Sequence, residues 1–151
     1  MSFIMKKFLG TILFALLLSG NTHAETLEEK RDHYIYNNLS SEYTECMHYY
    51  LIASEAIKTN DPDSKMIKNS IDSSNLASKL AFMYGEEAGM TVDGMVARSK
   101  LYADDMLKSL DNNYANISVL LIKYGDQCKG MIENPEVRNQ YWINKAYEKY
   151  K

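Results

Sequence analysis

The sequence predicts an all-α protein: an antiparallel bundle of four main helices plus a short C-terminal helix, joined by one disulfide. Apolar residues recur every three or four positions in each segment after residue 24, which places them on one face of a helix. No segment alternates apolar and polar residues in the manner of a half-buried strand. The chain has two prolines, Pro62 and Pro135, and both stand at breaks between helical segments.

Residues 1–24 have the anatomy of an export signal. A basic start at Lys6 and Lys7 precedes an apolar run over residues 8–18, and small residues stand three and one positions before a cut after Ala24. The apolar run is too short for a comfortable membrane span, which needs about 20 residues. We therefore expect residues 1–24 to be a signal peptide that is removed.

Residues 25–151 are expected to form a single helical domain, because a chain of this size can enclose a core. No second stretch approaches the length of a membrane-spanning helix, so we expect no stable membrane anchor after cleavage. Export predicts a periplasmic protein, with the extracellular medium as the alternative. If cleavage fails, the same first segment becomes a membrane tether.

The charge balance argues against one class of partner. The chain carries 17 Lys and Arg against 20 Asp and Glu. Without Lys6 and Lys7, 15 basic residues stand against 20 acidic ones, a formal net charge of −5. Nucleic-acid binders usually have a basic excess, so no nucleic-acid partner is expected.

The first helix is predicted over residues 27–59. Its apolar stripe follows spacings of four and three along Ile35, Leu39, Tyr43, Cys46, Tyr50, Ala53 and Ile57. The helix ends near Pro62, which lacks the N–H that a continuing helix needs. Asp63 or Ser64 then caps the next helix by accepting from its free N–H groups.

The second helix is predicted over residues 65–88. Its apolar stripe is Ile67, Ile71, Ser74, Ala77, Leu80 or Ala81, Tyr84 and Ala88. Gly89 is well placed to end it in a left-handed conformation. Thr91 opens the third helix as its N-cap. The apolar face of that third helix is predicted to be Val92, Met95, Val96, Ser99, Tyr102, Ala103, Met106 and Leu110.

A turn at residues 111–113 leads to a fourth helix over residues 115–132. Its apolar residues in line are Ile117, Leu120, Leu121, Tyr124, Cys128 and Met131. Asn134 and Pro135 then form an N-cap followed by proline at the first helical position, which predicts a short fifth helix over residues 135–147.

Cys46 and Cys128 are the only cysteines, and both fall on the apolar stripes of their helices. The first and fourth helices of an antiparallel bundle are neighbours, and each cysteine lies near the middle of its helix. Export places the pair in a compartment that permits disulfides. We therefore predict a Cys46–Cys128 disulfide, with two buried free thiols as the alternative.

Motifs for metal or haem are missing from the sequence. Glu45 and His48 form one Glu-x-x-His, but helical di-iron sites need two such motifs and two further glutamates. Neither a zinc spacing nor a covalent haem motif occurs. We expect no cofactor and no metal site.

Catalytic motifs are missing as well. The chain has no Gly-x-Ser-x-Gly turn and no glycine-rich phosphate loop. Adjacent carboxylates such as Glu86 and Glu87 are typical of a solvated helix surface. We therefore expect that the protein is not an enzyme.

Tyrosine is the unusual part of the composition, with 12 residues against 4 phenylalanines. Tyr36 and Tyr49 lie off the main stripe of the first helix, with Met47 nearby. Tyrosine and methionine are enriched in protein interfaces, so these three residues are the predicted partner surface. The alternative is that their rings only cover the flanks of the bundle.

Together these patterns predict an exported helical bundle that acts by binding a protein, as an immunity protein, inhibitor or envelope accessory protein does. The first alternative is a binder of a small apolar ligand in the core of the bundle. The second is an enzyme without a recognisable motif.

Overall fold

The computed structural model describes residues 25–151, and the predicted signal peptide lies outside this range. In order, the elements are α2 (Leu27–Asn60), α3 (Lys65–Glu87), α4 (Val92–Ser109), the 3-10 turn η1 (Tyr114–Asn116), α5 (Ser118–Glu133) and α6 (Pro135–Lys149). The described part of the chain contains five α-helices and no strand, which confirms the all-α prediction.

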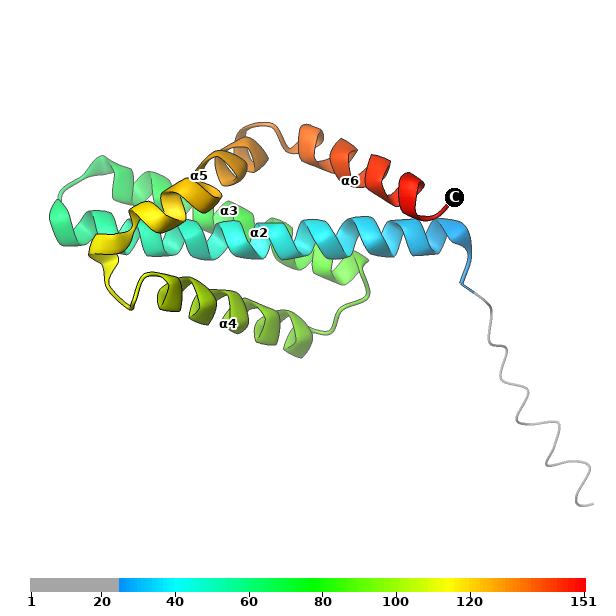
Figure 1. Ribbon diagram of the computed structural model, residues 1–151, viewed down its shortest axis with the longest axis horizontal. Coiled ribbons are helices and arrows are strands. Elements are labelled where there is room, and N and C mark those ends of the chain that lie inside the picture. The colour runs from blue at the N-terminus through cyan, green and yellow to red at the C-terminus, as the bar shows by residue number, and fades with distance from the viewer. Residues whose placement is uncertain (1–24) are drawn as a thin grey trace, which may run out of the picture.

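The long helix α2 is the axis of the fold, and every other helix contacts it. With 34 residues it is about 51 Å long at 1.5 Å per residue. The helix α3 turns back along it and makes the most extensive contact. Figure 1 shows α4 on one side of α2, with α5 and α6 forming an arch on the other. The arrangement therefore centres on one helix instead of placing four equal helices at four corners.

Local signals in the sequence explain where the helices begin and end. Thr26 and Glu29 form a capping box at the start of α2. Ser64 and Thr91 cap α3 and α4 through their side chains, as predicted. Gly89 ends the α3 segment with a φ of 70°, a left-handed conformation that glycine adopts at little cost.

The predicted start of the fourth helix is wrong by three residues, because a 3-10 turn precedes α5. The side chain of Asn113 accepts a hydrogen bond from the backbone of Ala115 and begins this turn. Asp111 and Asn112 both have a φ of 53°, which lets the chain reverse after α4. The regular α5 hydrogen-bonding pattern begins only after this reversal is complete.

A single core cluster draws residues from all five α-helices and from the C-terminal cap of α4. Its members are Ile35, Leu39, Tyr43, Cys46, Tyr49, Ile52, Ala77, Ala81, Met106, Leu110, Leu120, Tyr124, Cys128, Met131 and Ala146. The predicted disulfide is present: Cys46 and Cys128 are joined with their Cα atoms 5.2 Å apart. Both cysteines are fully buried, so the bond ties α5 to the middle of α2 inside this core.

The predicted apolar face of the third helix is partly wrong. Val92 and Val96 of α4 are 61% and 53% exposed, although the pattern placed them toward the core. Ser99 and Tyr102 face α2 as predicted, and Arg98, which the pattern left out, lies beside them. All three hydrogen-bond with polar side chains of α2. These polar contacts fix the rotation of α4, and the two valines face solvent as a result.

Candidate functional site

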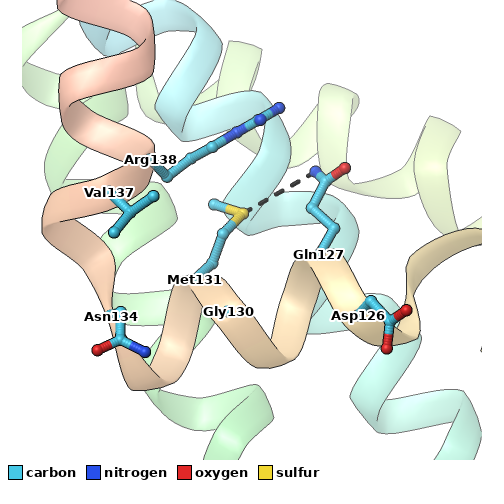
Figure 2. A pocket seen from close by; sticks show the side chains of 7 residues that line it. All are labelled: Asp126, Gln127, Gly130, Met131, Asn134, Val137 and Arg138. Atoms are coloured by element: carbon cyan, nitrogen blue, oxygen red, sulfur yellow. Dashed lines mark hydrogen bonds between the residues drawn. The ribbon is translucent and has the colours of Figure 1, made fainter.

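A cleft lies in the angle between α5 and α6, where the chain breaks at Asn134 and Pro135. Its volume is about 320 Å³. Figure 2 shows the residues that line it: Asp126, Gln127, Gly130, Met131, Asn134, Val137 and Arg138. The proline begins α6 at its first helical position, so α6 leaves in a new direction and the two helices enclose an angle.

Met131 is the buried apolar wall of this cleft. Its side chain is almost fully buried, and its sulfur lies 3.9 Å from the Cys46 sulfur. The hydroxyl of Tyr43 donates to the Met131 carbonyl at 3.2 Å. The disulfide and this hydrogen bond both connect α5 to α2, so they hold the α5 side of the cleft in place.

Arg138 is the charged wall, and Glu42 of α2 holds it. The Arg138 Nε donates to Glu42 Oε2 at 2.7 Å, and its Nη2 donates to Glu42 Oε1. Trp142 adds a third hydrogen bond, from its Nε1 to Glu42 Oε2 at 2.9 Å. The Glu42 side chain is only 12% exposed. Its hydrogen bonds with Arg138 raise the pKa of the guanidinium group above the ordinary value for arginine.

Aromatic rings surround the same guanidinium group. Its central carbon lies 4.4 Å from the Tyr141 ring centre and 5.5 Å from that of Trp142. Trp142 in turn packs edge-on against Tyr34 of α2, with ring centres 5.8 Å apart. The Arg138 side chain is therefore fixed by hydrogen bonds and ring contacts before any partner arrives.

The rim of the cleft exposes two large side chains of α6. Val137 is 73% exposed and Tyr141 is 41% exposed. They stand four residues apart, so they lie next to each other on one face of the helix. A second depression on this face of α6 is lined by Glu136, Val137, Gln140, Tyr141 and Asn144. The apolar rim thus continues from the cleft onto the outer face of α6.

The Glu-x-x-His of α2 directs its two side chains to different neighbours. Burial raises the pKa of Glu45, and Glu42 raises it further, while Lys123 of α5 and Arg138 of α6 act in the opposite direction. His48 instead lies 2.8 Å from the Ser99 hydroxyl of α4. The two side chains thus interact with different helices. Over residues 25–151 no group of three or more metal-ligating side chains comes together.

The His48–Ser99 contact brings together two groups that serve as base and nucleophile in hydrolases. Such a pair also needs a group that orients the imidazole. In the part of the chain that the structure describes, no hydrogen bond or ion pair joins a carboxylate to His48. This contact is therefore better explained as part of the packing between α2 and α4.

The structure separates the three residues of the predicted partner surface. Tyr36 stacks on Tyr84 of α3, with ring centres 6.0 Å apart, and the Met47 carbonyl accepts from Ser74 of α3 at 2.9 Å. Tyr49 packs on Tyr124 of α5 and is only 6% exposed. The expectation that Tyr49 lies outside the core is wrong, because α5 covers that side of α2. A binding role for Tyr36 and Met47 stays a prediction.

The α5–α6 cleft was missed by sequence reasoning. Its central contact joins Glu42 to Arg138, which are 96 positions apart. The only local signal was the break at Asn134 and Pro135, which predicts a change of direction but gives no angle between the helices.

Comparisons of the chain with protein-family models, curated proteins and solved structures find no match. None of the helices in residues 25–151 has the length and apolar character needed to cross a membrane.

Proposed function

We propose that the chain is an exported protein that binds another protein through the α5–α6 cleft and the adjoining face of α6. Immunity proteins, inhibitors and envelope accessory proteins are examples of proteins that act by binding another protein. The observation that carries the proposal is the pair Val137 and Tyr141, which stand exposed beside a cleft whose Arg138 wall is already fixed.

The chemistry of this surface supports protein binding. Tyrosine, tryptophan and arginine are enriched among the residues that dominate binding energy at interfaces. Tyr141, Trp142 and Arg138 come together here on one helix. Because these side chains are already ordered, this surface loses less conformational entropy on binding than a surface of mobile side chains would.

The size of the cleft also favours a protein partner over a small apolar ligand. Ligand pockets commonly span about 300–1,000 Å³ and enclose most of the ligand. The cleft, at about 320 Å³, lies at the low end of this range and opens onto the outer face of α6. It has room for one or two side chains of a partner.

Export is supported by two independent features. Residues 1–24 have the pattern of a signal peptide. The buried disulfide is typical of proteins in oxidising compartments. We place the protein in the periplasm, where a disulfide forms during folding.

A photo-crosslinking amino acid in place of Val137 tests this proposal in cells that export the protein. We expect a protein adduct from position 137 and none from Met66, which is also exposed and apolar but lies on α3. The adduct protein is then identified and purified, and its affinity for the chain is measured.

Gly130 offers a matched pair of variants for that measurement. A Cβ at this position meets no atom within 4 Å, so Gly130→Ala should fold, and thermal unfolding checks that the larger Gly130→Leu folds as well. Leucine fills the cleft and should weaken binding at least about tenfold, while alanine should leave binding nearly unchanged. Equal adducts from positions 137 and 66, or normal binding by Gly130→Leu, would contradict the proposal. A small molecule that copurifies in the cleft would favour the ligand alternative.

A further inference from the structure

The contact between α2 and α4 is unusually polar. Arg98 Nη2 donates to Asn37 Oδ1 at 2.6 Å, and the Arg98 Nη1 lies 3.3 Å from the Asn37 carbonyl oxygen. One turn further along α2, the Ser41 hydroxyl bonds to that of Tyr102. These contacts and the one between His48 and Ser99 follow one face of α2 at intervals of four and seven residues.

The apolar burial of α4 is confined to a few side chains, and Leu110 at its C-terminal cap is buried as well. Only Met95 and Met106 are buried among the residues of α4. Val92, Val96 and Leu101 are all more than half exposed. By contrast, α3 packs closely on α2 through small buried residues such as Ala77 and Ala81.

A polar contact of this kind costs little to open. When two hydrogen-bonded groups separate into water, each finds a new partner, so the net contribution of a typical hydrogen bond is small. Burial of a large apolar side chain contributes more, and that contribution is lost on exposure. Because α3 contacts α2 far more extensively than α4 does, α4 should separate from α2 more readily than α3 does.

The chain at both ends of α4 has left-handed backbone residues. Gly89 precedes the helix with a φ of 70°, and Asp111 and Asn112 follow it with a φ of 53° each. These positions form the sharp turns that let α4 lie beside α2. They are short, exposed connections in which a few dihedral changes can move a whole helix.

We propose that α4 is a flap that opens from α2 as a unit while the other helices stay packed, and that protonation of His48 favours its opening. The ring of His48 is half-buried in the contact between the two helices, against Ser99. A charged ring in this position gains stability when it reaches water, which happens when α4 leaves.

The surroundings of His48 supply no counter-charge for an imidazolium. On α4, the charged residues next to Ser99 in sequence are Arg98, which bonds to Asn37, and the exposed Lys100, and both are positive. On α2, Glu45 lies one turn away and interacts with Lys123 and Arg138 of α5 and α6. Also on α2, Glu55 is exposed and pairs with Lys58.

The charged residues of α3 from Lys65 to Lys79 are directed to solvent. Lys68 and Asp72 form an exposed ion pair with each other, and Lys65 and Lys79 are exposed. Burial lowers the pKa of His48, and the backbone of Ser99 opposes that effect only in part. The closed flap therefore favours the neutral ring.

Amide hydrogen exchange of the exported protein at pH 7.5 and pH 5.5 tests the proposal. Each rate is compared with the intrinsic rate at the same pH. At pH 7.5 we expect protection in residues 92–109 to be at least about tenfold below that in residues 74–85 of α3. At pH 5.5 protection in α4 should fall several-fold further, while that in α3 stays unchanged.

Two histidine variants identify the group responsible for the pH effect. In His48→Gln the side-chain amide can still bond to Ser99, so the protein should fold but lose the pH effect in α4. His33→Gln removes an exposed histidine of the same helix and should keep the effect. Equal protection of α4 and α3 in the unmodified protein would overturn the flap. A pH effect that survives in His48→Gln would overturn the role of His48.

Discussion

Glu42 and Arg138 lie 96 positions apart in the sequence, yet the Arg138 Nε donates to the Glu42 carboxylate at 2.7 Å beneath the α5–α6 arch. Trp142 completes the set of hydrogen bonds around this carboxylate. The position of α6 on α2 is thus decided by a charge that is nearly buried and fully satisfied. Removing one partner leaves the other charged and poorly solvated, which costs more than the pair itself contributes.

Replacing Arg138 by Met should therefore lower the free energy of unfolding by about 3 kcal/mol, because Glu42 loses its ionic partner while buried. Replacing both residues, as Glu42→Gln with Arg138→Met, should cost less than the single change. Urea unfolding followed by circular dichroism measures both effects. Lys145→Ala breaks an exposed ion pair with Glu148 and should change stability very little. A similarly small effect for Arg138→Met would show that the pair does not hold α6.

Removal of the disulfide should destabilise the protein strongly. The bond joins residues that are 82 positions apart, and a loop of this length corresponds to about 4.5 kcal/mol in the chain-entropy model. Measured losses are commonly about 2–5 kcal/mol, so Cys46→Ser should fall in this range. Thiol labelling of the denatured, unreduced protein should find no free thiol. Two labelled thiols in exported protein would contradict the bond.

Glu45 should reduce stability at neutral pH. Burial, with a further contribution from Glu42, raises its folded pKa above the value of 4.5, so the folded state favours the neutral carboxyl group. The neutral Glu45 carboxyl group therefore stabilises the folded state relative to the ionised group. That contribution is fully present below pH 4.5 and is lost as the pH rises through the folded pKa. Glu45→Gln should therefore be more stable than the unmodified protein at pH 7 and about equally stable at pH 4. Glu55→Gln, at an exposed position, should show no such difference between the two pH values.

The two tyrosines that the sequence placed together should now behave differently. Tyr49 lies in the core, so Tyr49→Ala should cost about 3–5 kcal/mol, as for other large buried rings. Tyr36 is only partly buried against Tyr84, so Tyr36→Ala should lower the free energy of unfolding clearly less than Tyr49→Ala does. Thermal unfolding of both variants measures the difference. Equal losses would mean that Tyr36 is also an essential core residue.

The helices and their ends could be predicted because their causes are local. Capping by Ser64 and Thr91, the left-handed Gly89 and the start of a helix at Pro135 each depend on a few neighbouring residues. The disulfide was also predictable, since both cysteines lie on apolar stripes of helices that become neighbours.

The rotation of each helix and the α5–α6 cleft depend on contacts between distant residues. The hydrophobic pattern placed Val92 and Val96 inward, but Arg98, which lies outside that pattern, hydrogen-bonds to Asn37 of α2, and the two valines face solvent. Polar pairing of this kind leaves no periodic signal in either helix. For the same reason, no spacing rule connects Glu42 with Arg138.

Two glycines provide a final comparison of packing with helix propensity. Gly85 of α3 is buried where α2 and α4 approach, and a Cβ there would overlap the Met95 sulfur and lie 3.2 Å from the Ser40 hydroxyl. Gly130 of α5 has no atom within 4 Å of the same position. Alanine favours a helix over glycine by up to about 1 kcal/mol at either site.

Gly130→Ala should therefore raise the free energy of unfolding by up to about 1 kcal/mol. Gly85→Ala gains the same propensity but crowds a well-packed site, which typically costs about 1–3 kcal/mol, so its net effect should be a loss. Met95 is itself buried and has little free space to move into. The double variant Gly85→Ala with Met95→Ala relieves the overlap and should recover part of the crowding cost relative to Met95→Ala alone. If Gly85→Ala stabilises the protein as much as Gly130→Ala does, then Met95 of α4 can move away from the new Cβ without any loss of stability.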